Sequence, residues 1–413
     1  MVQAPDGSIE QMQSAEGVRP ADRPSPAGQP SPAGQTVGSP RQLRILHLIV
    51  TLGHSNAQYN EHCLPMRFER DITICSFRPA SLDVPAELTV FEGDGTARGF
   101  SRALGRALDA REYDIVQAHA PGTGAMLLLH GLLHRRAMSD AVLTVHNTRA
   151  SFPLKNQGLL MPLFASFPTV VFCSHSAFES FPRRVRGLRG GMVEIVPNGV
   201  DTARVAAAIE GIDRPDPVFR VVAVGRLIPR KDPITLLRAF RLACSEDDEL
   251  RYVGDGAQRS RLVREAARSG LGSRVEVTGS VERDEVYRHI SRSSVYVSTS
   301  RSEGLPVAVL EAMACGRPVV LSDIAPHREI AGPADAVRLV APGDALGFAR
   351  EIRRLREMSP EARAEIGQRC RAIVEERFDL QSMHRSYERL YERVISRNGD
   401  AGSLHANRKE RVS

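Results

Sequence analysis

Two glutamates and a predicted helix start are spaced so that together they could bind a polar, anionic ligand. Glu303 comes immediately before Gly304-Leu305-Pro306, and Glu311 follows with seven residues between the two acids. Pro306 suits the first position of a helix, where a missing N–H costs nothing, so we predict a helix that starts here and stops at Gly316. Backbone N–H groups at a helix start form a natural anion site, and those expected here belong to Gly304, Leu305 and Val307.

Two cations follow the apolar run that ends at Val224. Arg226 comes directly after Gly225, and Lys231 follows a few residues later. Lysine is rare in this chain, whose basic residues are almost all arginine, so composition does not account for a lysine at this position. Two fixed cations could stabilise a phosphate-bearing ligand or leaving group. The alternative is a solvated basic turn.

These residues are embedded in an alternation of apolar strands and helices. The first strand is the run 43–50, and a second alternating block begins near Val218. This alternation predicts an α/β chain with two doubly wound parallel sheets. Ligands of such sheets gather at the carboxyl ends of the strands. The polar or small residues that follow predicted strands of the first block include Gly53, His54, His119, His146 and Ser174.

Composition sets the predicted domain boundaries. Residues 1–42 are rich in Pro, Gly, Ser and Gln and are predicted to be disordered, as is the basic tail 397–413. The remaining boundaries are 43–200 for a first domain, 201–217 for a linker, 218–377 for a second domain, and 378–396 for a final helix that could cross back to the first domain.

The stretch from Glu303 to Val320 resembles the donor-site motif of retaining glycosyltransferases of family four. The residues that carry the resemblance are Glu303-Gly304-Leu305-Pro306, Glu311-Ala312-Met313-Ala314 and Gly316-Arg317-Pro318-Val319-Val320. Those enzymes have the GT-B architecture, in which two Rossmann-like domains face each other across a cleft. The resemblance extends over nearly all of 43–396, and it implies the same fold here.

The resemblance also implies roles for residues of the second domain. Arg226 and Lys231 would bind the donor diphosphate, and the backbone beside Val281 would contact the base. Glu303 would accept hydrogen bonds from hydroxyls of the transferred sugar, and Glu311 from those of the ribose, which suits carboxylates. The donor-binding set is completed by Gly225, Gly304, Leu305 and Val307.

Two matches lie in the first domain. His146 corresponds to an active-site histidine near the sugar, and Gly53 to a glycine loop that lets the diphosphate approach. The family usually has paired glycines in this loop, whereas Gly53-His54-Ser55-Asn56 contains one. The phosphate contacts of this loop are therefore left open.

We predict a retaining, metal-independent glycosyltransferase that moves a sugar from a UDP- or GDP-linked donor to a hydroxyl of a sugar or lipid-linked acceptor, in polysaccharide or glycoconjugate biosynthesis. No cofactor or metal is predicted, because Arg226 and Lys231 would stabilise the leaving diphosphate and no Asp-x-Asp signature stands on a suitable loop. Two alternatives remain. A GT-B sugar-nucleotide epimerase would need an acid–base carboxylate set that we cannot locate. A non-catalytic nucleotide-sugar-binding protein would be expected to lack Glu303, Lys231 or His146.

Composition bears on partners and location. The net charge of +6 suits anionic partners, but it is too small to favour nucleic acid without a basic and aromatic stretch. Six scattered cysteines, no bilayer-length apolar run and no signal-peptide layout predict a cytoplasmic protein. Peripheral contact with an anionic membrane is a further hypothesis, because an apolar segment at 153–168 precedes a basic cluster. The alternative is a core helix followed by a solvated turn containing Arg183, Arg184, Arg186 and Arg189.

Overall fold

The computed structural model describes residues 42–53, 56, 58–135, 138–183, 191–212, 218–332 and 335–410, with 399–410 described by their backbone alone. The predicted tail before Gln42 and part of the predicted linker, 213–217, lie outside this range, as do Arg184, Arg186 and Arg189. From Gln42 onward the chain forms one compact unit. None of the described helices is both long and apolar enough to cross a membrane.

The first domain is built on a parallel sheet of seven strands in the order β3-β2-β1-β4-β5-β6-β7. The order reverses between β1 and β4, which is where α/β sheets open a crevice beyond the carboxyl ends of their strands. The strands are β1 (Arg44–Ile49), β2 (Asp71–Ser76), β3 (Thr89–Glu92), β4 (Ile115–Ala118), β5 (Ala141–Val145), β6 (Thr169–Phe172) and β7 (Met192–Ile195).

Helices surround this sheet. A π-helix, η1, follows the loop after β1, and a short helix, α6, follows β7 at the start of the predicted linker. The helical elements are η1 (Tyr59–Cys63), α1 (Ala97–Ala110), α2 (Pro121–His134), η2 (Arg149–Ser151), α3 (Leu154–Ser166), α4 (His175–Glu179) and α6 (Thr202–Ala208).

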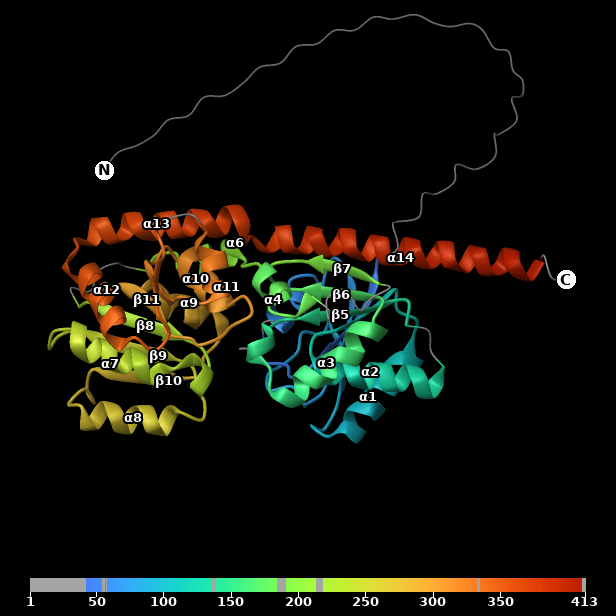
Figure 1. Ribbon diagram of the computed structural model, residues 1–413, viewed down its shortest axis with the longest axis horizontal. Coiled ribbons are helices and arrows are strands. Elements are labelled where there is room, and N and C mark those ends of the chain that lie inside the picture. Colours follow the sequence, from blue (N-terminus) through green and yellow to red (C-terminus); the bar gives the residue numbers. More distant parts are fainter. Residues whose placement is uncertain are drawn as a thin grey trace, which may run out of the picture. The chain divides into compact units, whose positions relative to one another are not determined.

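The second domain has a parallel sheet of six strands in the order β10-β9-β8-β11-β12-β13, which reverses between β8 and β11. Its strands are β8 (Arg220–Val224), β9 (Glu249–Val253), β10 (Val275–Gly279), β11 (Val295–Ser298), β12 (Val319–Ser322) and β13 (Arg338–Val340). Its helices are η3 (Pro229–Lys231), α7 (Pro233–Ala243), α8 (Arg259–Arg268), α9 (Arg283–Ser291), α10 (Val307–Ala314), α11 (Ala325–Ala331), α12 (Ala345–Glu357) and α13 (Pro360–Arg377). Two doubly wound parallel sheets confirm the predicted fold class (Figure 1).

A last helix, α14 (Leu380–Glu410), returns to the first domain (Figure 1). Successive side chains of a strand face opposite sides of the sheet. On one face, Ile45 and Ile115 pack in a cluster with Leu390 and Val394 of α14. On the other face, Leu46 belongs to the core that α1, α2 and α3 cover. Sequence reasoning ended this helix at 396 and predicted disorder over 397–413. The helix instead continues to Glu410, so the disordered tail is corrected over 397–410.

The segment of the membrane hypothesis forms α3, which is only partly buried. Leu160 and Phe164 are buried in the core of the first domain, as the core-helix interpretation expects. Leu154 and Met161, however, are 84% and 39% exposed. Helix α3 therefore both packs on the domain and presents apolar side chains to solvent.

Candidate active site

The donor-site motif forms the connection between β11 and α10. Pro306 has an extended backbone, with φ −75° and ψ 106°, and α10 begins at Val307, one residue later than predicted. Gly316 has φ 67°, the left-handed conformation that glycine adopts readily after a helix, as the sequence predicts. Leu305 is buried, and its carbonyl accepts a hydrogen bond from the Asn198 side chain at 3.0 Å. The hydrogen bond from Asn198 thus fixes the backbone just before α10, and Gly316 allows the chain to turn after it.

Gly304 brings the motif against the first domain. It forms an isolated antiparallel bridge with Asn147, and a Cβ at this position would lie 1.9 Å from the carbonyl oxygen of His146. The Thr148 hydroxyl donates to the carbonyl of Glu303 at 2.8 Å. A side chain at Gly304 would clash with backbone, so glycine here allows the loops after β5 and β11 to touch.

Lys231, which is partly buried, forms an ion pair with the buried Glu303. Their Nζ and Oε1 atoms lie 2.6 Å apart, and Glu303 is 4% exposed. Burial opposes ionisation of Glu303, but the charge of Lys231 and hydrogen bonds from Lys231 and Ser300 outweigh it and hold the pKa of this carboxyl below its ordinary value. Glu303 is therefore a carboxylate at neutral pH, as a hydrogen-bond acceptor for sugar hydroxyls should be.

Two cavities lie at the carboxyl ends of strands of the two sheets, and Lys231 lines the smaller one. The smaller, of about 30 Å³, is lined by Gly225, Arg226 and Lys231 at the carboxyl ends of β8 and β11. The larger, of about 470 Å³, is lined by residues of both domains, among them His146, Asn147, Arg226 and Arg230. Arg226 borders both cavities. A ligand in the larger cavity would thus contact both domains.

Arg226 and Arg230, which line the larger cavity, differ in solvent exposure and in hydrogen bonding. Arg226 is exposed, whereas Arg230 donates to the Asn147 side chain at 3.1 Å. Burial lowers the pKa of Arg230, and the nearby charge of Arg226 adds to this, although Glu303 acts in the opposite direction. Gly225 has φ 137°, which favours glycine, and a Cβ there would lie 3.7 Å from Nζ of Lys231. Arg226 therefore shares one cavity with Lys231 and the other with Arg230.

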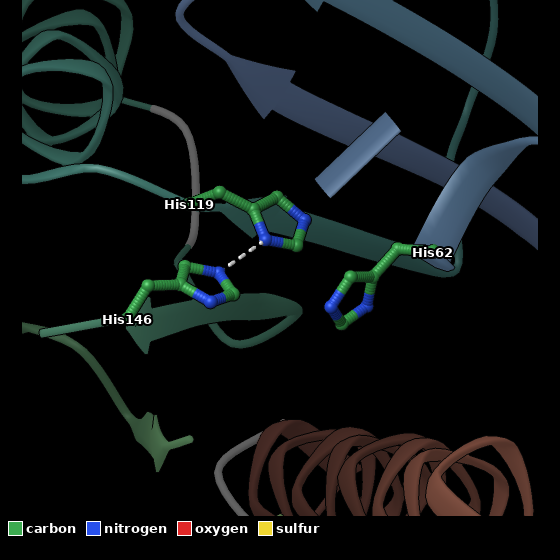
Figure 2. Close-up of side chains that lie close together, drawn as sticks. All are labelled: His62, His119 and His146. Carbon is green, nitrogen blue, oxygen red and sulfur yellow. Dashed lines mark hydrogen bonds between the residues drawn. The ribbon is translucent and has the colours of Figure 1, made fainter. Parts of the chain in front are cut away.

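His146 is the last member of a chain of three hydrogen-bonded histidines. Its Nε2 lies 2.9 Å from Nδ1 of His119, and Nε2 of His119 lies 2.9 Å from Nδ1 of His47. Burial lowers the pKa of His146 to about 4, so its ring is neutral at pH 7. Figure 2 shows the hydrogen bond between His146 and His119, with His62 nearby.

The same cluster contains a grouping that could hold a metal ion. Ring nitrogens of His62, His119 and His146 all lie within 4.8 Å of one another. His119 uses both of its ring nitrogens in hydrogen bonds with other histidines, and His146 uses one. Nε2 of His62 is buried with no hydrogen-bond partner in the described part of the chain.

Glu311 is engaged by a neighbour that sequence reasoning did not name. Arg283 Nη2 lies 2.5 Å from Oε1 of Glu311 and 3.2 Å from Oε1 of Glu61, which belongs to η1 of the first domain. Burial raises the pKa of both carboxyls, that of Glu61 to about 8, and Arg283 only partly offsets this. One arginine thus serves two buried acids, one from each domain. A ribose at Glu311 would share its carboxylate with Arg283.

Gly53 and Val281 have contacts of their own. The carbonyl of Gly53 accepts from the backbone of Asn56 and the side chain of Asn60, which ties the glycine loop to η1. Val281 is partly buried against the core. Among the described residues, no hydrogen bond or ion pair joins Gly53 or Val281 to Lys231 or Glu303. His54 and Ser55 of this loop lie outside the described residues.

The residues of the candidate site that sequence reasoning missed are those whose partners are distant in the chain. His47 was treated as part of a strand, and Glu61 and Arg283 were not considered. His119 was noted only because it follows a strand. The available signal was the position of His119 and His146 after neighbouring strands, since β4 and β5 are paired. Nothing local marks Glu61 or Arg283.

Comparison with known proteins connects this site to a family. The model of glycosyl transferases group 1 matches 207–372, and that of glycosyltransferase family 4 matches 67–204. The putative glycosyltransferase EpsD of Bacillus subtilis is 29% identical over 65% of this chain and 74% of its own length. The UDP-Gal:alpha-D-GlcNAc-diphosphoundecaprenol alpha-1,3-galactosyltransferase of Escherichia coli is 28% identical over 54% of this chain and 61% of its own.

Solved structures share the fold. Anabaena HepE in complex with UDP and glucose superposes with a TM-score of 0.69 at 21% identity, over 85% of this chain and all of that one. Each of the two domains therefore matches a family model, and the donor-site motif lies within the match to glycosyl transferases group 1. The fold is shared with a solved structure. The chain is a GT-B glycosyltransferase and belongs to the family-four type.

Proposed function

We propose that this protein is a retaining, metal-independent glycosyltransferase that transfers a sugar from a UDP- or GDP-linked donor to an acceptor hydroxyl. The acceptor is a sugar or a lipid-linked sugar, and the product belongs to polysaccharide or glycoconjugate biosynthesis. The observation that carries the proposal is the ion pair between Lys231 and the buried Glu303. Arg226 lines the cavity at Lys231 and also the larger cavity that both domains line.

The ion pair suits the two ends of a nucleotide sugar. Departure of the sugar leaves negative charge on the diphosphate, and Lys231 with Arg226 would stabilise it in the transition state. Glu303, held as a carboxylate, would accept hydrogen bonds from hydroxyls of a sugar that carries positive charge in an oxocarbenium-like state. Before the donor binds, each charge neutralises the other. A bound donor would break this ion pair, so that Lys231 binds the diphosphate and Glu303 binds the sugar hydroxyls.

Metal independence is supported by the supply of fixed cations. A leaving diphosphate needs positive charge, which either a metal ion or side chains can provide. Arg226, Arg230 and Lys231 converge at the cavities from one loop and η3. We propose that these side chains take the role of the metal, and that no cofactor is needed.

The donor class is supported by relatives. HepE was crystallised with UDP, and the name of the Escherichia coli relative includes UDP-Gal, so a uridine donor has the greater support and a guanosine donor remains part of the proposal. The same name includes a lipid-linked acceptor. A lipid-linked acceptor here would bring the protein to the cytoplasmic face of a membrane, where the exposed apolar side chains of α3 could make peripheral contact.

A donor panel tests the proposal. The protein is incubated with UDP- and GDP-sugars, each with and without EDTA, and release of nucleoside diphosphate is measured together with the shift in melting temperature. We expect at least one donor to stabilise the fold and to be turned over, at a rate that EDTA leaves unchanged. Absence of both effects for every donor would overturn the proposed function, and loss of turnover in EDTA would overturn metal independence.

A further inference from the structure

Three histidines on three neighbouring strand positions form a continuous chain that ends in the candidate active site. His47 lies within β1, His119 directly follows β4, and His146 directly follows β5. These strands are adjacent in the sheet, at and beside the point where the strand order reverses. Both hydrogen bonds of the chain are 2.9 Å long and use different nitrogens of the central ring. The sheet itself therefore places the three rings in line.

The three rings are neutral at physiological pH. Burial lowers the pKa of His47 to about 3 and that of His146 to about 4. Burial, and then the neighbouring histidines, hold the pKa of His119 well below its ordinary value. A neutral imidazole has one N–H donor and one lone-pair acceptor. Each ring in the chain must therefore donate at one nitrogen and accept at the other.

Only two proton arrangements satisfy both hydrogen bonds. In one, Nδ1–H of His47 donates to His119, whose Nδ1–H donates to Nε2 of His146, and the proton of His146 is then on Nδ1. In the other, every proton sits on Nε2, and Nδ1 of His146 is a bare acceptor. The tautomer of His146 is consequently linked to the tautomer of His47, at the other end of the chain.

The surroundings of His47 favour the first arrangement. Nδ1 of His47 is used in the chain, which leaves Nε2 as its free nitrogen. His47 lines a cavity of about 20 Å³, which has room for about one water molecule, and its other polar lining residues are Arg70, His62, His384, Tyr387 and Tyr391. The Arg70 guanidinium also pairs with Glu388. A guanidinium has donors and no acceptor, and the charge of Arg70 also acts, after burial, to lower the pKa of His47. A lone pair on Nε2 is therefore favoured over a proton.

We propose that His47 and His119 are positioning residues that hold His146 in the tautomer with its proton on Nδ1, so that His146 offers a hydrogen-bond donor to the substrate. His146 lines the large cavity together with Arg226 and Arg230. In Figure 2 its second nitrogen points away from His119. His146 then acts as a donor to an oxygen of the bound sugar or acceptor, and not as a base. The inference rests on the proposed function for the identity of this ligand alone.

The described geometry fits hydrogen bonding better than metal ligation. Ligand nitrogens around a tetrahedral zinc ion lie roughly 3.4 Å apart, given Zn–N bonds of about 2.0–2.1 Å. His119 and His146 are closer than this, at 2.9 Å. His119 would also have to give up one of its two present hydrogen bonds. A metal ion bound to these histidines would therefore be an alternative to the hydrogen-bonded chain, and metal analysis of the purified protein detects it.

The tautomer can be measured without any substrate. The full chain is prepared with ¹⁵N-labelled histidine, and long-range ¹H–¹⁵N correlations identify which nitrogen of each ring carries the proton. The signals of His146 are assigned from their loss in His146→Gln. We expect His146 and His119 to carry the proton on Nδ1. A proton on Nε2 of His146, or a stoichiometric metal ion that stays with the purified protein, would overturn the inference, whatever the donor panel shows.

Variants at the far end of the chain test whether His47 sets this tautomer. His47→Leu should leave His146 in a mixture of tautomers and lower kcat roughly tenfold to a hundredfold, with KM for the donor little changed. His47→Asn places an amide donor near the position of Nδ1, so it should restore most of kcat and the single tautomer of His146.

The matched control is His62→Leu. The His62 ring lies 4.9 Å from that of His119, centroid to centroid, so it shares the packing of the cluster. No hydrogen bond among the described residues joins it to the chain of three. We expect His62→Leu to leave the tautomer of His146 unchanged. If His62→Leu shifted the tautomer as much as His47→Leu, or if His47→Leu did not shift it, the positioning role of His47 would be wrong.

Discussion

Nζ of Lys231 lies 2.6 Å from Oε1 of Glu303, and the two residues are separated by 72 positions in the chain. The pair joins the loop after β8 to the loop after β11, which are neighbouring strands at the reversal point of the second sheet. Each charge is the other's partner until a ligand arrives.

Lys231→Ala should remove transition-state stabilisation of about 2–4 kcal/mol, a fall in kcat/KM of roughly a hundredfold or more. The reason is the loss of a fixed cation at the diphosphate, and the same loss is expected for Arg226→Ala. The measurement is steady-state release of nucleoside diphosphate. Lys155→Ala, which removes an exposed lysine of α3, is the matched control and should be near wild type. Near-normal turnover in Lys231→Ala would show that the cation is misassigned.

Glu303→Gln and Glu311→Ala should separate the two acids by role. Glu303→Gln keeps the shape of the side chain but weakens its acceptance of hydrogen bonds, so we expect a large fall in kcat with little change in nucleotide affinity. Glu311→Ala should instead weaken nucleotide binding, because it removes the expected ribose acceptor. Calorimetric titration with UDP and GDP measures both effects. Identical titration curves for the two variants would contradict this division.

The pair of Lys231 and Glu303 should contribute stability that is lost in acid. The folded-state pKa of Glu303 lies below its ordinary value, so the folded protein binds this proton less readily than the unfolded chain. The contribution is complete above the unfolded pKa of about 4.3 and disappears as the pH falls through the folded value. Urea unfolding between pH 6 and pH 3 measures it. Glu303→Gln should flatten this part of the profile, and an unchanged profile would contradict the assignment.

Glu61 should have the opposite effect on the pH dependence of stability, because its contribution is lost as the pH rises. Burial raises its pKa to about 8, although Arg283 partly offsets this, so the folded state binds a proton that the unfolded chain has lost. Stability from this group therefore falls as the pH rises from about 5 to 8. Thermal unfolding across this range should show a shallower decline in Glu61→Gln than in wild type. An equal decline in the variant and in wild type would mean that Glu61 is ionised and paired with Arg283 throughout this range.

Contact with an anionic membrane should depend on the exposed apolar side chains of α3. Leu154→Ser with Met161→Ser is expected to reduce co-sedimentation with vesicles that contain anionic lipid, because both side chains face solvent. Val263→Ser, at a position that is 50% exposed on α8 of the other domain, is the control. Replacing Arg183, Arg184, Arg186 and Arg189 by Ser tests the basic cluster. Wild-type protein that never binds such vesicles, at any salt concentration, would exclude docking.

Sequence patterns predicted the fold and the donor-site motif because both are local. Strand and helix alternation is read within short windows, and Glu303, Gly304 and Gly316 fall within one strand–loop–helix unit. The length of α14 was underestimated, since its polar end gives no apolar periodicity beyond Ser396.

The contacts between distant segments could not be predicted in this way. Glu61 and Arg283 are 222 positions apart, and His47 and His119 are 72 apart. Their meeting depends on strand order and on how the domains touch, which a single sequence does not display. Gly304 illustrates the difference: its place in the motif was predicted, whereas its contact with the His146 carbonyl required the structure.

The most direct test of the central claim is the stereochemistry of transfer in EDTA. The product formed from the donor that the panel identifies is followed by ¹H NMR, through the coupling constant of its anomeric proton. A retaining enzyme with its own cations should give an α-linked product from an α-linked donor, at the same rate with and without EDTA. A β-linked product, or a reaction that EDTA abolishes and a divalent metal restores, would contradict the account.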